Sequence, residues 1–555
     1  MRFRGSRELV MVLLGAVLLV ILMTYPLIVG FDHVGRVDNN DGRWSIWVVS
    51  WVAHALTTDP LHLFRANIFY PHQDALAYSE ANIAAGVVGV PVWLLTKNPY
   101  ATHNFVLLVS FVVSFAGAYY LCRYLTGSRQ AAMVAAVLFA FCPFVFVRFA
   151  HIQLLLVGGL PFCMLAFHRL VDRTTVGRTV ALGAILWFQG LACAYYGIFG
   201  GMAVGISSIV IAITRGRWRE WRYWAAIGGA AVVSIGLTVP FFLPYIALQR
   251  ETGFARTLAG AQTYSANLVA WTASGAWAHR WALDPSRSEV LFPGVVALVL
   301  GLAGAFIGWQ LTAARTGHEP SSTDSRLDRG VVLSYIITGL VSFWITFGPK
   351  AGLYSVLYAT VPVFSFLRAP GRTGIVVTLC LTVLASIAMA RLLERWRNAT
   401  WLVAGLMVLA LADLAQAPIG LREAPPTPSA YQALARLPVA PVAVFPYWAN
   451  NLNYHGHAEY MLASTAHWQP LINGYSDHIP QDFRDNSLIL RGFPTLESFD
   501  VLKGLGARYV VFHLDRYAGP SHEEVLGKIE AFANYLRPID KTGDVWLFEI
   551  VGWPR

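Results

Sequence analysis

The sequence predicts a mainly helical, polytopic membrane protein that ends in a small α/β domain. Hydrophobic residues make up 56% of the 555 residues and charged residues only 13%, and the mean hydropathy is +0.52. In a soluble protein about a quarter of the residues are charged, so cytosolic, fibrous and disordered proteins are excluded. Residues 1–419 hold 30 Lys and Arg against 17 Asp and Glu, whereas residues 420–555 hold 11 against 14. We therefore expect a basic transmembrane domain over 1–419 and a mildly acidic soluble domain over 420–555.

The N-terminal segment has the features of a first transmembrane helix. Arg2, Arg4 and Arg7 precede an apolar stretch over 9–30. This stretch is too long for a signal peptide, and no cleavage site of small residues follows it. The segment is predicted to stay in the mature protein, with its N-terminus in the cytoplasm.

Eleven apolar segments have about the length needed to cross a bilayer. They lie at 9–30, 104–122, 131–149, 153–171, 179–196, 197–214, 223–247, 290–311, 330–348, 374–391 and 399–417. Short, arginine-dense segments occur before the first of them and in five of the loops, and such segments lie in the cytoplasm. These arginines are 2, 4 and 7; 123 and 129; 169, 173 and 178; 215, 217, 219 and 222; 315, 326 and 329; and 391, 395 and 397. The basic pI of about 9.4 is thereby explained without a nucleic-acid partner.

The apolar segment 82–97 is treated separately because it is short and contains Gly86, Gly89 and Pro91. A full crossing here would move every later arginine cluster to the outer side. We expect an interfacial or re-entrant helix instead. Four parts of the chain then lie on the outer side of the cell (inner) membrane. They are the large first loop 31–103, the loops 248–289 and 349–373, and the C-terminal domain.

The first outer loop contains the strongest candidates for chemistry. Trp44, Trp47, Val48 and Trp51 recur at helical spacing, which predicts an amphipathic helix on the outer membrane surface. Asp41 stands at the start of this helix. Asp41 is either a functional carboxylate or a simple helix cap, and Asp38 is either a second candidate or an ordinary turn residue.

Four further polar residues are candidates on the outer side. Glu80 precedes the 82–97 segment and offers another carboxylate. His151 marks the end of a span and is either an interfacial anchor or a functional group. Arg368 and Arg372 run against the charge bias of an outer loop. Their guanidinium groups either neutralise a lipid phosphate or are attracted to headgroups in general.

The C-terminal residues predict an α/β domain without a metal site. The segment 425–428 (Pro-Pro-Thr-Pro) is typical of a linker. Helices are expected at 429–437, 496–505 and 521–536, and strands at 442–445, 509–512 and 545–551. The histidines here are scattered, and the five cysteines all fall in apolar runs, so neither set has metal-ligand spacing.

Taken in order along the chain, these motifs resemble the GT-C superfamily of integral-membrane glycosyltransferases, in particular a bacterial group related to YfhO-like proteins. The matching pieces are Asp41 with its Trp-rich helix, 66–71, Ser79 and Glu80, 151–153, Glu289 with 291–294, 367–372, and 470–475.

The resemblance implies a transferase that uses a polyprenyl-phosphate-linked sugar as donor and a glycan, lipid or protein as acceptor, with no cofactor and no metal. An acidic residue of the first outer loop is then the expected base, for which Asp41 is the first match and Asp38 the second. A carboxylate would take the proton of the acceptor hydroxyl, and Arg368 or Arg372 would meet the donor phosphate.

Two other functions remain open at this point. A transporter or lipid flippase would place ionisable residues within its spans, which are nearly free of them here. A non-catalytic protein of the same fold could instead assemble factors of the cell envelope.

Overall fold

The computed structural model describes residues 2–253, 256–281, 283, 289–314, 327–396 and 400–555. Arg315, Arg326 and Arg397, which the sequence analysis assigns to cytoplasmic loops, lie outside these residues. The chain forms two compact units. Unit 1 contains Met1–Val29, Val106–Leu243 and Ala255–Ile419, and unit 2 contains Gly30–Phe105, Pro244–Phe254 and Gly420–Arg555.

Unit 1 is built almost entirely of helices. Its longer helices, two of which extend at one end into unit 2, are α1 (Arg2–Met23), α4 (Pro99–Thr126), α5 (Arg129–Ala140), α8 (Gly159–Asp172), α9 (Val176–Ala192), α10 (Ala194–Thr214), α11 (Trp221–Thr252), α13 (Val295–Ala314), α14 (Arg329–Thr346), α16 (Gly374–Arg395) and α17 (Thr400–Leu414). The shorter ones are α6 (Pro143–Phe146), α7 (Ile152–Leu155), α12 (Leu258–Thr263) and α15 (Leu353–Thr360). By length and composition, seven helices among the described residues can cross a membrane.

Helices occur in all eleven segments where the sequence predicts spans. The break that was predicted after residue 196 lies at Cys193, and two other segments each form two separate helices. Residues 131–149 form α5 and α6, and residues 153–171 form α7 and α8. Pro143 is the first residue of α6 and has no N–H to continue the hydrogen-bond ladder of α5. Non-helical backbone at membrane depth is tolerated only where protein covers it or where it lines a cavity. The interrupted backbone between α5 and α8 is therefore expected to be covered by protein or to line a cavity.

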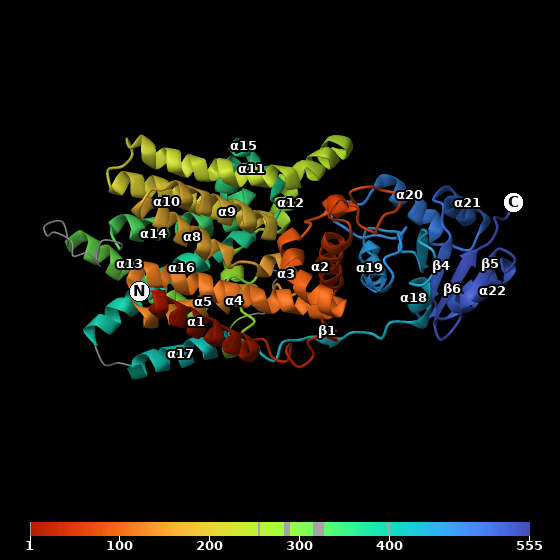
Figure 1. Ribbon diagram of the computed structural model, residues 1–555, viewed down its shortest axis with the longest axis horizontal. Coiled ribbons are helices and arrows are strands. Elements are labelled where there is room, and N and C mark those ends of the chain that lie inside the picture. Colours follow the sequence, from red (N-terminus) through yellow and green to blue (C-terminus); the bar gives the residue numbers. More distant parts are fainter. Residues whose placement is uncertain (1, 254–255, 282, 284–288, 315–326, 397–399) are drawn as a thin grey trace. The chain divides into compact units, whose positions relative to one another are not determined.

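Helix α16 forms the centre of unit 1, where it packs against α5, α13 and α14. A Cβ on Gly304 of α13 would overlap the backbone carbonyl of Leu384, so glycine allows the two helices to approach closely. Helices α8, α9 and α10 run side by side (Figure 1). Helix α11 leaves Val232 and Ile235 71% and 63% exposed, as expected for a face that meets lipid.

Unit 2 contains two sheets and the helices that cover them. The strands are β1 (Val34–Gly35), β2 (Arg422–Glu423), β3 (Val442–Phe445), β4 (Tyr509–His513), β5 (Leu536–Asp540) and β6 (Val545–Ile550). The helices are α2 (Asn40–Thr58), α3 (Ile83–Thr96), α18 (Ser429–Leu434), α19 (His457–Ala463), α20 (Gln481–Leu490), α21 (Leu496–Gly504) and α22 (Pro520–Ala531). Strands β3, β4, β6 and β5 form one sheet in this order, with β3 parallel to β4 and the other pairs antiparallel (Figure 1).

The three strands that the sequence predicts are β3, β4 and β6. Strand β5 differs from the prediction, which placed Leu536 at the end of a helix. It pairs only with β6, and its Arg537 and Pro538 are exposed. An edge strand with a proline and little apolar alternation has a weak sequence signal.

The first outer loop and the C-terminal residues share unit 2 because they pair with each other. Strand β1 pairs with β2, and the backbone N–H of Phe69 donates to Asn473 O at 3.1 Å. Helix α2 packs against α3 and α19. As a result Trp47 is buried, and the Trp51 indole N–H donates to Leu63 O at 3.0 Å. These tryptophans therefore pack inside unit 2, and do not form the membrane-surface face that helical periodicity alone predicts.

Candidate functional site

Two arginines of the loop before α16 stack on tyrosines from other parts of unit 1. The Arg368 guanidinium lies 5.3 Å from the ring centroid of Tyr264, and that of Arg372 lies 4.5 Å from the ring of Tyr195. The backbone N–H of Arg368 donates to the Tyr195 hydroxyl at 2.9 Å. Both guanidinium planes are therefore oriented by aromatic faces, as suits recognition of a flat or tetrahedral anion.

A buried ion pair borders this loop. Arg148 Nη2 donates to Glu289 Oε2 at 2.5 Å, and the two side chains are only 11% and 7% exposed. The Arg148 guanidinium also lies 5.0 Å from the ring of Phe144 in α6. A Cβ on Gly371 would lie 3.0 Å from the Glu289 carboxyl carbon, so the loop approaches the ion pair closely. The ion pair thus supports the segment that carries Arg368 and Arg372.

We call Arg148, Arg368, Arg372, Glu289, Tyr195 and Tyr264 the arginine cluster. Arg148 and Arg372 both act electrostatically on Tyr196, which places the two guanidinium groups in one neighbourhood. Arg148 Nε is buried and has no hydrogen-bond partner within the described part of the chain. A phosphate oxygen could accept a hydrogen bond from this Arg148 Nε.

The broken helices explain how Arg148 reaches this place. Arg148 follows α6, and the His151 N–H donates to Arg148 O at 2.8 Å before α7 begins. The Tyr196 hydroxyl donates to Leu154 O at 3.0 Å, which satisfies a carbonyl of the short helix α7. His151 is half-buried beside this turn. Of the predicted outer residues, Arg368, Arg372 and His151 therefore belong to unit 1.

The predicted catalytic carboxylates belong to unit 2. The cap of α2 is Asn39, whose Oδ1 accepts from the N–H groups of Asp41 and Gly42 at 2.8 and 3.2 Å. The alternative that Asp41 is a helix cap is therefore wrong, and Asp41 lies in the first turn of the helix. Asp38 is partly exposed and pairs with Arg36 Nε at 3.1 Å.

Glu80 also lies in unit 2, in a small polar group. Its carbonyl accepts from Asn82 Nδ2 at 2.9 Å, and its carboxylate is close enough to Tyr245 to act on it electrostatically. Ser79 donates to Asp477 at 3.4 Å beside it. Glu80 and the arginine cluster thus belong to different units.

Sequence reasoning did not assign Arg148, Tyr195 or Tyr264 to a site, and it named Glu289 only as part of the family resemblance. Arg148 and Glu289 are 141 residues apart, so no periodic pattern connects them. An arginine inside an apolar segment is itself a signal, because an isolated charge is costly in a membrane and needs a partner.

Within the described residues, no group of three His, Cys, Asp or Glu side chains can hold a metal ion. The C-terminal histidines have structural partners. His457 Nε2 donates to Trp448 O at 3.0 Å, and His513 Nε2 lies 2.7 Å from the Tyr431 hydroxyl. Burial lowers the pKa of His457 to about 3 and that of His513 to about 4.

Comparison with known proteins places the chain in a family. The family model for DUF6311, a domain of unknown function, matches residues 12–415. The chain belongs to the DUF6311 family. No curated protein matches the sequence of this DUF6311 chain.

Solved structures show which fold the DUF6311 chain has. It is similar to the arabinofuranosyltransferase AftD from Mycobacteria, with a TM-score of 0.54 and 14% identity over 98% of this chain and 41% of that one. It also matches ArnT from Cupriavidus metallidurans in the apo state, with a TM-score of 0.49 and 15% identity over 100% of both chains. A third match is the Archaeoglobus fulgidus oligosaccharyltransferase, with a TM-score of 0.48 and 13% identity over 95% of this chain and 72% of that one.

These findings confirm the predicted fold class: a mainly helical, GT-C-like polytopic membrane protein with a small C-terminal α/β region. At such low identity the likeness is one of fold alone. The DUF6311 chain spans less than half the length of AftD.

Proposed function

We propose that the chain is a membrane glycosyltransferase, which moves a sugar from a polyprenyl-phosphate donor to a glycan, lipid or protein acceptor on the outer face of the membrane. The observation that carries this proposal is the arginine cluster. Its three arginines include a buried Arg148, and two of its guanidinium groups are oriented by tyrosine rings. The fold shared with AftD, an arabinofuranosyltransferase, agrees with this chemistry.

In the proposed reaction, the acceptor oxygen attacks the anomeric carbon of the donor sugar. The bond between this carbon and the phosphate oxygen breaks, and the polyprenyl phosphate leaves with the electron pair. Arg368 and Arg372 stabilise the negative charge that develops on the phosphate. The proton of the acceptor hydroxyl passes to a carboxylate, which acts as general base.

Asp41 is the carboxylate that we propose as base, with Asp38 as the weaker candidate. Asp38 pairs with Arg36 Nε at 3.1 Å, so its carboxylate is already engaged by a guanidinium group. Asp41 does not cap α2, because Asn39 fills that role. Glu80 and His151 are proposed as substrate-binding residues. The narrower relation to YfhO-like proteins stays a prediction of the sequence.

The direct experiment measures donor binding and sugar transfer by the purified protein in lipid nanodiscs. The donors are radiolabelled polyprenyl-phosphate sugars, offered with membrane-derived acceptors. Asp41→Asn should retain donor binding and lose transfer by a factor of about 10² or more, whereas Asp38→Asn should keep most of the transfer. Full transfer by Asp41→Asn would refute the assignment of the base.

The same assay tests the phosphate contacts. Hydrogen bonds to charged groups contribute about 1.5–3 kcal/mol each, so Arg368→Ala with Arg372→Ala should weaken donor binding by at least about 100-fold. Arg280→Ala is the matched control, because Arg280 is an exposed arginine of unit 1 that stacks on Trp277 at 3.7 Å. Unchanged donor binding in the double variant would remove the proposed role of the arginines.

Other outcomes separate the remaining functions. Donor lipid that moves between leaflets without sugar transfer would indicate a flippase. Donor binding with neither movement nor transfer, in every donor and acceptor combination, would indicate a non-catalytic assembly protein.

Sidedness is a separate part of the proposal. We place the N-terminus in the cytoplasm, and the loop 31–103 and the domain 420–555 outside the cell membrane. All five natural cysteines are buried, so single new cysteines can be labelled in intact cells with an impermeant maleimide. Asp38→Cys and Leu452→Cys should react, whereas Val176→Cys should not. Labelling of positions 38 and 452 on opposite sides of the membrane would refute the proposal.

A further inference from the structure

An apolar groove with arginines at one end lies on the surface of unit 1. A cavity of about 580 Å³ is formed by side chains of α1, α4, α8 and α9. Leu9, Phe162, Leu165 and Ile185 contribute to its apolar walls, and Arg169 and Arg178 contribute its charge. Leu9 is 44% exposed and Arg169 is exposed as well, so the groove opens to the surroundings of the helices.

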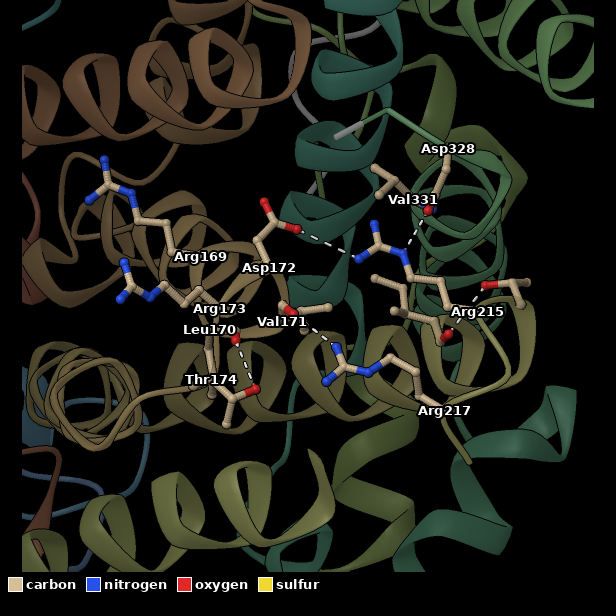
Figure 2. Close-up of polar contacts among 12 residues, drawn as sticks. Arg169, Leu170, Val171, Asp172, Arg173, Thr174, Arg215, Arg217, Asp328 and Val331 are labelled. Carbon is tan, nitrogen blue, oxygen red and sulfur yellow. Dashed lines mark hydrogen bonds and ion pairs between the residues drawn. The ribbon is translucent and has the colours of Figure 1, made fainter. Parts of the chain in front are cut away.

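The arginines of the groove are held in place by neutral groups. The Arg169 guanidinium lies 5.6 Å from the ring of Tyr124. Arg178 Nη1 donates to the carbonyls of Arg169 and Arg173, the latter at 3.2 Å, and so closes the C-terminal end of α8. Figure 2 shows the side chains of Arg169 and Arg173 extending to the same side, away from Asp172.

The nearby carboxylates already have other partners. Asp172 accepts from the Tyr124 hydroxyl at 2.6 Å and pairs with Arg215 Nη1 at 3.6 Å. Asp328 pairs with Arg215 Nε at 2.6 Å (Figure 2). In the part of the chain that the structure describes, Arg169, Arg173 and Arg178 have no carboxylate partner. Their positive charge is therefore available to an external anion.

We propose that this groove binds an anionic phospholipid, with the headgroup phosphate on Arg169 and Arg178 and an acyl chain along the apolar walls. A small free anion would leave the apolar walls without a contact, whereas a zwitterionic lipid would leave the positive charge of the arginines uncompensated. Basic pockets between transmembrane helices on the cytoplasmic side are suited to anionic headgroups. Arg169 and Arg178 lie in α8 and α9, next to the loop that joins these helices, and the sequence analysis predicts this arginine-dense segment to be cytoplasmic. The inference is independent of the proposed donor site, which uses other residues.

Lipid titration of the full chain, followed by native mass spectrometry in detergent, tests this proposal. Phosphatidylglycerol should bind more tightly than phosphatidylcholine. A basic residue near the membrane surface contributes about 1 kcal/mol, so Arg169→Ala should lower the phosphatidylglycerol affinity about fivefold, and Arg169→Ala with Arg178→Ala about 25-fold. The control is Arg219→Ala with Arg222→Ala. These arginines lie at the same end of unit 1 but stack on the neighbouring tryptophans, and their removal should leave the affinity unchanged.

A second variant tests the apolar part of the groove without touching a charge. Ala166 lines the groove, and Ala166→Trp should fill it and lower the affinity for phosphatidylglycerol at least tenfold. Inorganic phosphate at millimolar concentration should not displace the bound lipid. Equal affinities for the two lipids, an unaltered affinity in Arg169→Ala or Ala166→Trp, or displacement by inorganic phosphate would each overturn the proposal.

Discussion

The buried ion pair between Arg148 and Glu289 provides the sharpest prediction about stability. Replacing Glu289 by Leu leaves the Arg148 guanidinium, only 11% exposed, without its carboxylate. Two unit charges about 4 Å apart interact by about 4 kcal/mol at the effective dielectric constant of a protein interior. Arg148 Nε already has no partner among the described residues, so little remains to compensate the loss. We expect Glu289→Leu to lower the free energy of unfolding by about 3–5 kcal/mol.

A double-mutant cycle isolates the contribution of the charge pair. Arg148→Met should also destabilise the protein, but Arg148→Met with Glu289→Leu should be more stable than Glu289→Leu alone, because no unpaired charge remains buried. Urea unfolding in detergent, followed by tryptophan fluorescence, measures the free energies. A coupling energy of about 3 kcal/mol is expected. Additive effects, or a double variant less stable than both single variants, would refute the reasoning.

Two further predictions concern the remaining parts of the fold. Burial lowers the pKa of His457 to about 3 and that of His513 to about 4. In the unfolded chain a histidine has its usual pKa of about 6.5, so below pH 6.5 the unfolded chain binds more protons than the folded chain. Stability of unit 2 should therefore be complete above pH 6.5 and fall by about 1.4 kcal/mol per pH unit for each histidine as the pH drops toward 4. Hydrogen exchange of the C-terminal peptides measures this loss of stability. His457→Gln should make the loss smaller. If no histidine variant changed the loss, the argument from burial would be wrong. Gly304→Ala should lower the free energy of unfolding by about 1–3 kcal/mol, because the added methyl group would overlap the backbone of Leu384. The control is Gly405→Ala, whose methyl group would meet no atom within 4 Å. This control should not change the free energy of unfolding in the same urea assay.

The helices of unit 1 were predictable because each carries its own signal. An apolar segment of about 20 residues has to satisfy its backbone groups internally, and a helix is the only way to do so within one segment. The strands β3, β4 and β6 were equally local, since each is a short apolar run. Strand β5 lacked such a run and was missed. The charge at 368 and 372 was also visible, because an arginine in a predicted outer loop is exceptional.

The failures share one feature, which is that the stabilising partner is far away in the chain. The apolar face of α2 predicted a membrane surface, but Trp47 and Trp51 are buried in unit 2, where α2 packs against α3 and α19. Of the two readings of Asp41, the helix cap is excluded because Asn39 fills that position. Glu289 was named only as part of the family resemblance, because its partner Arg148 lies 141 residues away in the chain.

The amino-acid sequence by itself determined that this protein is a mainly helical membrane protein with a small C-terminal α/β region, since composition and segment length act through local hydration and local hydrogen bonding. Only the tertiary structure decided which polar side chains share a site. The arginine cluster and the lipid groove each gather side chains from several helices, and their electrostatic energies depend on distances of a few ångströms that no local pattern encodes.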